Sequence, residues 1–546
     1  MLLLLACTGR QAAPPAPKRV VLSLDHGWTH EGAALHGTDP SPISMSLSFD
    51  LPAELAQPGS LLVLEGLRDR AVVTVNGTAT PEVVGGNAPA EVVVGPHLRA
   101  GQNTLTIDIA AIAGDSKALV GQPDVQWRLG ALPTLVIRPA THIEWVSLPL
   151  VGDDVRPIAG VEAAPEGATV RFFAALDGEI LQALGQAPVV NGVARGELSD
   201  WDGPRWGRGE ASDLFHLVAV LEDSAGSTLD SAAWRTGARS VSFDEALLLS
   251  GEKATLLGAR LSYGGDLVAQ MRVHADAGLN SGEYHGDPWD RRTMELADEI
   301  GLPVAFVPRC DGRVRFRESA YQNKTTELEA QDERLLSAAA HHPSLVLWVQ
   351  ELRIPHDHPL TASLTEDPSD RPVVQVDLPG APFPVLKAGA PYPTKLGDQG
   401  PWWIIELTNG PPDQVPVALR AALSTQALGG VLRATDSINR NDPWMRTAGP
   451  EIATIAQELG AAPLPSSRRA SSLVELSGPA PGTVVWIEVP HAGGFGTVVG
   501  SETTRLSAWH EGDAVVRVGD ASHPVTLDAG EWKRFERIGG ATQLAL

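Results

Sequence analysis

The chain has 546 residues, 43% hydrophobic and 20% charged, which is enough for roughly three to five domains with buried cores. Its 42 Lys and Arg against 66 Asp and Glu give a net charge of −24, which argues against nucleic acid or an anionic membrane surface as a partner. Two cysteines exclude a disulfide framework, and 55 Gly with 43 Pro suit many strands joined by tight turns.

Residues 1–18 are expected to lie outside any folded domain. The segment Leu4-Leu5-Ala6-Cys7 resembles a bacterial lipoprotein cleavage box, after which Cys7 would carry the lipid. The apolar run is short and no basic residues precede it, so a chance match stays open. Residues 11–18, QAAPPAPK, read as a flexible tether. This implies a protein of the cell envelope, lipid-anchored or secreted.

Residues 19–240 are predicted to form two strand-rich domains. Residues 41–49 alternate with period two, and Asn76-Gly77 is a strong hairpin signal because both residues tolerate positive φ. This pattern indicates a jelly-roll β-sandwich over residues 19–140. The runs TVRFFAALDG and LFHLVAVLED suit an immunoglobulin-like sandwich over residues 141–240.

Residues 241–465 alternate strand-like and helical runs, which predicts a (β/α)8-type barrel. Helices are expected over residues 268–277, 291–300 and 327–340. Buried strands are expected at LPVAFVP, HPSLVLWVQ, RPVVQVD, PWWIIEL and GGVLRATD. Fewer than eight clear units can be counted, which favours a shortened barrel. Residues 466–546 return to strands and predict a small C-terminal all-β domain.

The segment HHPSLVLWVQELR, residues 341–353, combines a buried strand with a carboxyl group at its end. Residues 345–348 are a continuous apolar run, and Gln350 and Glu351 follow where the strand should stop. In a βα-barrel the carboxyl ends of the strands carry the active site. Glu351 is therefore a catalytic candidate. The alternative is a surface carboxylate or a cap of the next helix.

A second carboxyl group follows the same pattern. Glu406 ends the apolar run of PWWIIEL, and the segment EDPSDRPVVQV lies between the two glutamates. These motifs resemble those of the glycoside hydrolases related to β-galactosidase, β-glucuronidase and β-mannosidase. The resemblance implies a retaining β-glycosidase with Glu351 as acid/base and Glu406 as nucleophile, about 5–5.5 Å apart.

The resemblance also implies a set of sugar-binding residues and shows departures from the family pattern. Glu283 stands where the family has an Arg, and Arg433 is a candidate to restore that charge. Gln350 replaces the Asn expected to bond the sugar 2-hydroxyl. The expected substrate-binding residues are Gln350, Asn280, His285, Tyr392, Trp402, Arg433 and Trp444.

Other chemistries find little support in the sequence. His356 and His358 alternate in PHDHP, but no third ligand lies within reach, so no metal site is predicted. No nucleotide-binding or serine-hydrolase motif occurs, and no cofactor is expected. Three hypotheses remain: a glycosidase acting on a carbohydrate, an inactive homologue that binds glycan or protein at the bacterial surface, or a purely structural cell-surface protein.

Overall fold

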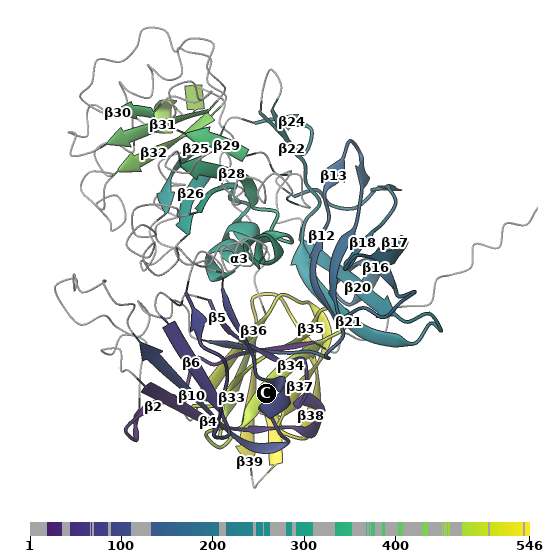
Figure 1. Ribbon diagram of the computed structural model, residues 1–546, viewed down its shortest axis with the longest axis vertical. Coiled ribbons are helices and arrows are strands. Elements are labelled where there is room, and N and C mark those ends of the chain that lie inside the picture. The colour runs from purple at the N-terminus through teal and green to yellow at the C-terminus, as the bar shows by residue number, and fades with distance from the viewer. Residues whose placement is uncertain are drawn as a thin grey trace, which may run out of the picture.

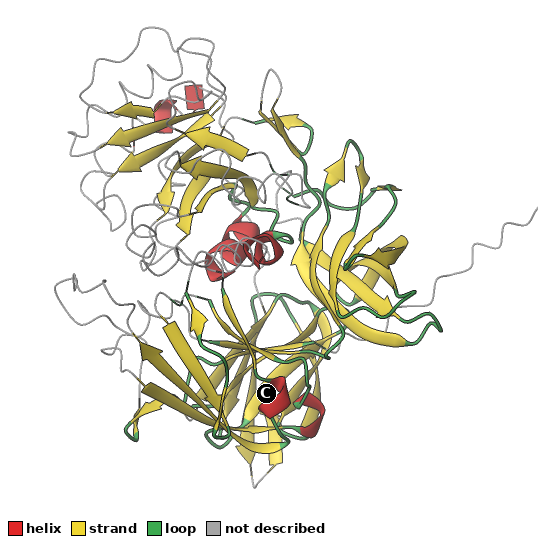
Figure 2. Ribbon diagram, viewed as in Figure 1, coloured by secondary structure: helices red, strands yellow, loops and turns green. Residues whose placement is uncertain are grey.

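The computed structural model describes residues 19–34, 44–110, 133–261, 280–308, 334–351 and 472–545 with short gaps, and isolated strands and residues between 367 and 458 (Figure 1). For several strand residues, including 259–260, 285–286, 350–351 and the strands between 373 and 434, only the backbone is described. Strands dominate this part of the chain (Figure 2). No helix within it is long and apolar enough to span a bilayer.

The two ends of the chain share one eight-stranded sheet. Strand β1 (Val20–Ser23) pairs antiparallel with β11 (Thr134–Ile137) and parallel with β35 (Gly493–Val498). The sheet therefore runs from the N-terminal segment into the C-terminal segment, as the lower half of Figure 1 shows. Its other strands are β38 (Ala521–Leu527), β37 (Gly512–Val518), β34 (Val484–Val489), β5 (Leu61–Leu64) and β9 (Ala90–Val93).

A seven-stranded sheet packs on the first one. Trp28, Phe49 and Trp486 are among the side chains buried between the two sheets. The predicted hairpin is confirmed: Asn76 and Gly77 have φ values of 52° and 83° and join two antiparallel strands. The strands are β3 (Ala33–Ala34), β2 (Thr29–His30), β4 (Ser44–Leu51), β10 (Gly101–Ala110), β6 (Arg70–Val75), β7 (Thr78–Ala79) and β8 (Val83–Val84).

Residues 142–236 form a second seven-stranded, antiparallel sheet. Its core includes Trp201 and Phe215, whose ring centroids lie 5.0 Å apart. The strands, in spatial order, are β12 (His142–Ser147), β15 (Ile158–Glu162), β18 (Val193–Arg195), β17 (Glu179–Val190), β16 (Thr169–Leu176), β20 (Phe215–Glu222) and β21 (Thr228–Thr236).

Three smaller sheets complete the β scaffold. One lies beside the sheet of residues 142–236, one leads into the parallel strands, and one packs under the C-terminal part of the shared sheet. They contain β13 (Leu150–Val151), β14 (Asp154–Val155) and β19 (Ser199–Asp200); β22 (Val241–Phe243), β23 (Leu247–Leu249) and β24 (Glu252–Lys253); and β36 (Thr503–Ala508), β33 (Ser472–Ser477), β39 (Trp532–Ile538) and β40 (Ala541–Ala545).

Eight parallel strands form a nearly closed barrel, more strands than the clear units that could be counted in the sequence. The spatial order follows the chain, and β32 pairs with β25, which leaves β29 and β30 at the two ends of the path. The strands are β25 (Leu256–Leu261), β26 (Ser281–Gly286), β27 (Val304–Pro308), β28 (Leu345–Glu351), β29 (Val373–Val376), β30 (Val385–Lys387), β31 (Trp402–Leu407) and β32 (Gly429–Ala434). Strand β30 escaped sequence analysis because three residues show no periodicity.

Two helices cover the outer face of strands β26 to β28. Helix α3 (Arg291–Ile300) and the helix of residues 334–339 agree with the sequence prediction. Tyr284, Phe306 and Trp348 are register partners on neighbouring strands, and their rings pack against these helices. Because successive strand residues face opposite sides, Glu283 and Ala305 belong to the inner face of the barrel.

Candidate functional site

The carboxyl edge of the barrel brings the two predicted catalytic residues to the same side of the fold. Glu351 is the last residue of β28, the fourth parallel strand in chain order, and Glu406 is the last but one of β31, the seventh. Parallel strands end at one edge, so both backbone positions lie at this rim. Their side chains lie outside the described part of the structure.

The register around Glu406 places a cationic residue on each side. Lys387 of β30 and Arg433 of β32 are both its Cα partners in the parallel sheet. Register partners share a face of a sheet, with neighbouring strands about 4.8 Å apart. Nearby positive charge favours the ionised form of a carboxyl group.

Glu283, which stands where the resemblance implies an arginine, has an arginine as its backbone register partner. Glu283 of β26 is fully buried, and its register partner on β25 is Arg260. On the other side of β25, Ala259 is the register partner of Leu432 on β32. The residues that follow them, Arg260 and Arg433, therefore lie at neighbouring positions of the two strands. Glu406, Arg433, Arg260 and Glu283 therefore occupy one level across four neighbouring strands.

The other predicted site residues divide between the two edges of the barrel. His285 pairs with Val307 near the end of β26, and Gln350 pairs with Gln375 near the end of β28, both toward the rim. Asn280, which is buried, precedes β26 at the amino edge, and Trp402 begins β31 there. Trp402 lies about 13 Å along its strand from Glu406, at about 3.3 Å per residue.

Some predicted positions fall outside the described residues: Tyr392, Trp444, Cys7, and the pair His356 and His358. Their roles stay predictions. In the part of the chain that is described, no group of three His, Cys, Asp or Glu side chains is arranged to hold a metal ion.

The amino edge of the barrel contains a buried network that sequence analysis did not identify. Arg371 Nη1 donates to Asp367 Oδ2 at 2.8 Å, and its Nε donates to the Leu345 carbonyl at 2.9 Å. Trp348 Nε1 donates to the same Asp367 oxygen at 2.7 Å. The two charged residues belong to the segment EDPSDRPVVQV. Its conspicuous Asp and Arg therefore anchor the start of β28 rather than reach the rim.

A second buried pair lies at the same edge, beside the start of β28. With His342 neutral, its Nδ1–H donates to Asp298 Oδ2 at 2.6 Å, and the Ser344 amide donates to the other oxygen at 2.8 Å. Burial lowers the pKa of His342 to about 3 and raises the pKa of Asp298 to about 6. At neutral pH the pair is an ionised carboxylate bound to a neutral imidazole.

Comparison with known sequences identifies a distant relative. No family model matches the chain. A β-galactosidase of Psychromonas ingrahamii is 24% identical over 344 residues, which is 55% of this chain and 32% of that protein. The chain therefore spans about a third of the length of this curated relative.

Solved structures share the fold across most of the chain. A GH2 β-galacturonidase from Eisenbergiella tayi, bound to galacturonate, has a TM-score of 0.60 and 14% identity, with 83% of this chain and 99% of that chain covered. An FMN-binding β-glucuronidase from Faecalibacterium prausnitzii has a TM-score of 0.57 and 14% identity over 94% and 98%. A β-glucuronidase from Ruminococcus gnavus in complex with D-glucuronic acid has a TM-score of 0.51 and 15% identity over 76% and 79%. The chain thus has the multidomain fold of these GH2 enzymes and a distant sequence similarity to a β-galactosidase.

Proposed function

We propose that the protein is a retaining β-glycosidase, with Glu351 as acid/base and Glu406 as nucleophile. The observation that carries the proposal is where the two acids lie: Glu351 ends the fourth of eight parallel strands, and Glu406 is the last but one residue of the seventh. Two carboxyl groups of different protonation state are what glycoside hydrolysis with retention needs.

The proposed reaction proceeds in two steps. Glu351 protonates the glycosidic oxygen while the Glu406 carboxylate attacks the anomeric carbon, which forms a glycosyl-enzyme and releases the alcohol. Glu351 then takes a proton from water as that water attacks the same carbon and frees Glu406. Gln350 would bond the sugar 2-hydroxyl, and His285 would contact the sugar from β26.

The charges at the level of Glu406 support its role as nucleophile. The resemblance places an arginine at position 283, and its replacement by Glu283 would by itself disfavour a second ionised carboxyl group. Lys387 and Arg433 in register with Glu406, and Arg260 in register with Glu283, offset that loss. Positively charged residues are thus present in register with Glu406 and Glu283, on neighbouring strands and not at position 283 itself.

The proposed substrate is a β-linked carbohydrate. The solved relatives include proteins bound to galacturonate and to D-glucuronic acid. Sugar acids are therefore the first class to test, and the two cationic positions beside Glu406 are compatible with a substrate carboxylate.

An inactive, glycan-binding protein is the second candidate, and one observation favours it. Glu283 is a completely buried acid on the inner face of the barrel, where the resemblance places a cation. If Arg260 and Arg433 serve only to neutralise Glu283, Glu406 loses its support and hydrolysis stops, while the cleft keeps its shape.

Hydrolysis of nitrophenyl β-glycosides decides between the two candidates. The panel contains the β-glucuronide, β-galacturonide, β-galactoside, β-glucoside and β-mannoside, and the proteins are the wild type, Glu351→Gln, Glu406→Gln and the exposed control Glu54→Gln. We expect turnover of at least one substrate by the wild type and the control, with the β-anomer released first in proton NMR. Loss of about 10²–10⁴-fold is expected for Glu351→Gln. No turnover on any sugar, or equal rates in all four proteins, contradicts the proposal.

The finer architecture and the location are part of the same proposal. Residues 19–140, 141–240 and 241–465 would form a jelly roll, an immunoglobulin-like sandwich and a (β/α)8 barrel, and residues 466–546 an all-β C-terminal domain. A lipid on Cys7 would tether them to the bacterial envelope. Detergent-phase partitioning of the wild type and Cys7→Ser in cells tests the anchor, and identical partitioning of the two proteins contradicts it.

A further inference from the structure

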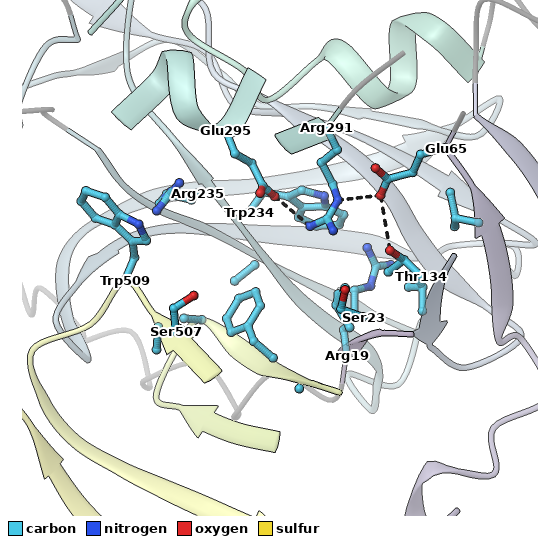
Figure 3. Close-up of a pocket in the computed structure, with 18 of the residues that line it drawn as sticks. Arg19, Ser23, Glu65, Thr134, Trp234, Arg235, Arg291, Glu295, Ser507 and Trp509 are labelled. Atoms are coloured by element: carbon cyan, nitrogen blue, oxygen red, sulfur yellow. Dashed lines mark hydrogen bonds and ion pairs between the residues drawn. The ribbon is translucent and has the colours of Figure 1, made fainter. Parts of the chain in front are cut away.

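A cavity of about 680 Å³ lies outside the barrel, where helix α3 faces the β scaffold (Figure 3). This volume is within the range of about 300–1,000 Å³ that small-molecule sites occupy. Arg291, Glu295, Asp298 and Glu299 line it from one side of α3, while Met294 and Ala297 on the same helix pack against the barrel strands. Helix α3 therefore separates the cavity from the barrel interior.

The arginines that shape the cavity already face acidic partners. Arg291 donates to Glu65 and to Glu295, both at 2.8 Å, as the dashed lines in Figure 3 show. Arg235 donates to Glu299 at 2.6 Å. A ligand with a formal negative charge would have to displace one of these acids. The paired groups can still bond uncharged hydroxyl groups, because carboxylate and guanidinium groups have more acceptor and donor positions than these contacts use.

The lining as a whole disfavours an anionic ligand further. It contains seven Asp or Glu residues and five Arg residues. Glu65 and Asp298 are buried in these walls, and burial raises the pKa values of Glu144 and Glu299. An anionic ligand would lose its hydration in this cavity, and the arginines that could replace it are already paired with acidic residues.

Aromatic and apolar surface lies between the ion pairs. The guanidinium of Arg19 lies 4.5 Å from the ring centroid of Trp234, and that of Arg235 lies 4.5 Å from that of Trp509. These contacts fix the two indole rings, and Phe495 lines the cavity with them. Rigid aromatic faces next to fixed hydrogen-bonding groups match a pyranose ring, which is apolar on its C–H faces and polar at its edge.

We propose that this cavity is a second binding site, separate from the barrel rim, for a neutral saccharide. The site does not depend on hydrolysis at the rim. A ligand in it would contact α3 of the barrel, the sheet of residues 142–236 and the sheet shared by the two chain ends at once, so it would bridge the barrel and the scaffold.

The test is a binding experiment on the full chain carrying Glu406→Gln, which prevents consumption of the probes at the rim. The probes are methyl β-glucoside, cellobiose, lactose and, as the charged comparison, methyl β-glucuronide. Binding is measured by saturation-transfer difference NMR and tryptophan fluorescence. Ser507→Trp fills the cavity from an exposed position of β36, and Ser522→Trp makes the same change at an exposed position of β38 that does not line it.

We expect at least one neutral probe to bind, with affinity reduced at least tenfold by Ser507→Trp and unchanged by Ser522→Trp. Trp509→Leu, which removes an aromatic wall without adding bulk, should weaken binding in the same direction. The proposal is overturned if no neutral probe binds, if the glucuronide competes with the neutral probe and binds more tightly at this site, or if Ser507→Trp, folded by circular dichroism, binds like Ser522→Trp.

Discussion

The two edges of the parallel barrel use charged residues in different ways. At the amino edge, Asp367 and Arg371 are almost completely buried, bonded to each other and to the main chain. At the carboxyl edge, Glu351 and Glu406 come at or near the ends of strands and have cationic or polar neighbours in register. Breaking a buried, hydrogen-bonded pair is costly for the fold, while the carboxyl ends of barrel strands are where active sites are built.

This difference gives a rule for interpreting the segment between the two glutamates. Its Asp and Arg are the most distinctive residues of the region, yet their bonds reach Trp348 and the main chain at the start of β28. The distinctive Asp367 and Arg371 therefore stabilise the barrel and do not take part in the proposed site. The proposed catalytic residues have less distinctive neighbours in the sequence; Glu406, for example, is followed in its strand by Leu407 alone.

The largest effect is expected from breaking the amino-edge ion pair. Asp367→Ala leaves Arg371 buried without its carboxylate, which should cost about 3–5 kcal/mol of unfolding free energy. Glu82→Ala, which breaks the exposed pair between Arg70 and Glu82, should cost about 1 kcal/mol or less. Urea unfolding followed by fluorescence measures both. Similar losses of unfolding free energy in the two variants would mean that the buried pair at the amino edge contributes no more than an exposed one.

At the carboxyl edge, a change of charge should alter activity and leave stability nearly unchanged. Arg433→Leu removes a cation in register with Glu406, so kcat/KM should fall about 10–100-fold, or about 1.4–2.7 kcal/mol. The acid limb of the pH–rate profile should move to higher pH because the ionised carboxylate is less favoured. The exposed Arg99→Leu is the control, and an unchanged pH profile for Arg433→Leu would argue against the proposed role.

The buried imidazole at the amino edge predicts a pH dependence of stability. The folded-state pKa of His342 is about 3, so below pH 6.5 the unfolded chain binds the proton and the folded chain does not, and stability is lost as pH falls. The pKa of Asp298 is raised to about 6, so between pH 6 and 3.8 the folded chain binds this proton more readily and gains stability as pH falls. We expect His342→Gln to remove only the first contribution, up to about 2 kcal/mol between pH 6.5 and 5.

Unfolding curves at pH 5 and pH 7 measure this contribution. The exposed His26→Gln is the matched control and should follow the wild type at both pH values. A His342→Gln variant whose stability changes with pH as steeply as that of the control would mean that His342 is protonated in the folded protein.

The smallest effect is expected from Trp348→Phe. This change removes the indole donor to Asp367 but keeps an aromatic ring beside Phe306 and the ion pair with Arg371, so it should cost about 1–2 kcal/mol of stability. Because Trp348 lies on the outer face of the barrel, kcat/KM should stay within about twofold of wild type in the nitrophenyl assay. A loss of activity without a loss of stability would connect this position to the rim.

Local patterns in the sequence predicted much of the fold. The Asn76-Gly77 hairpin, the helix over residues 291–300 and the apolar strand of residues 345–349 follow from turn conformations and from helical and strand periodicity. The same patterns put Glu351 and Glu406 at or near strand ends, because each acid follows an apolar run, Glu406 directly and Glu351 after Gln350. These features need only the interactions of a residue with its near neighbours in the chain.

Pairings between distant segments required the tertiary structure. Nothing local marks β1 as a partner of β35, more than 470 residues away, or the three residues of β30 as a barrel strand. The partners of Glu406 are also decided by register, which sets Lys387 and Arg433 beside it from separate strands. Register depends on how whole sheets pack and close, and the cavity beside α3 depends on how the barrel meets the scaffold, so neither leaves a periodic signal in the sequence.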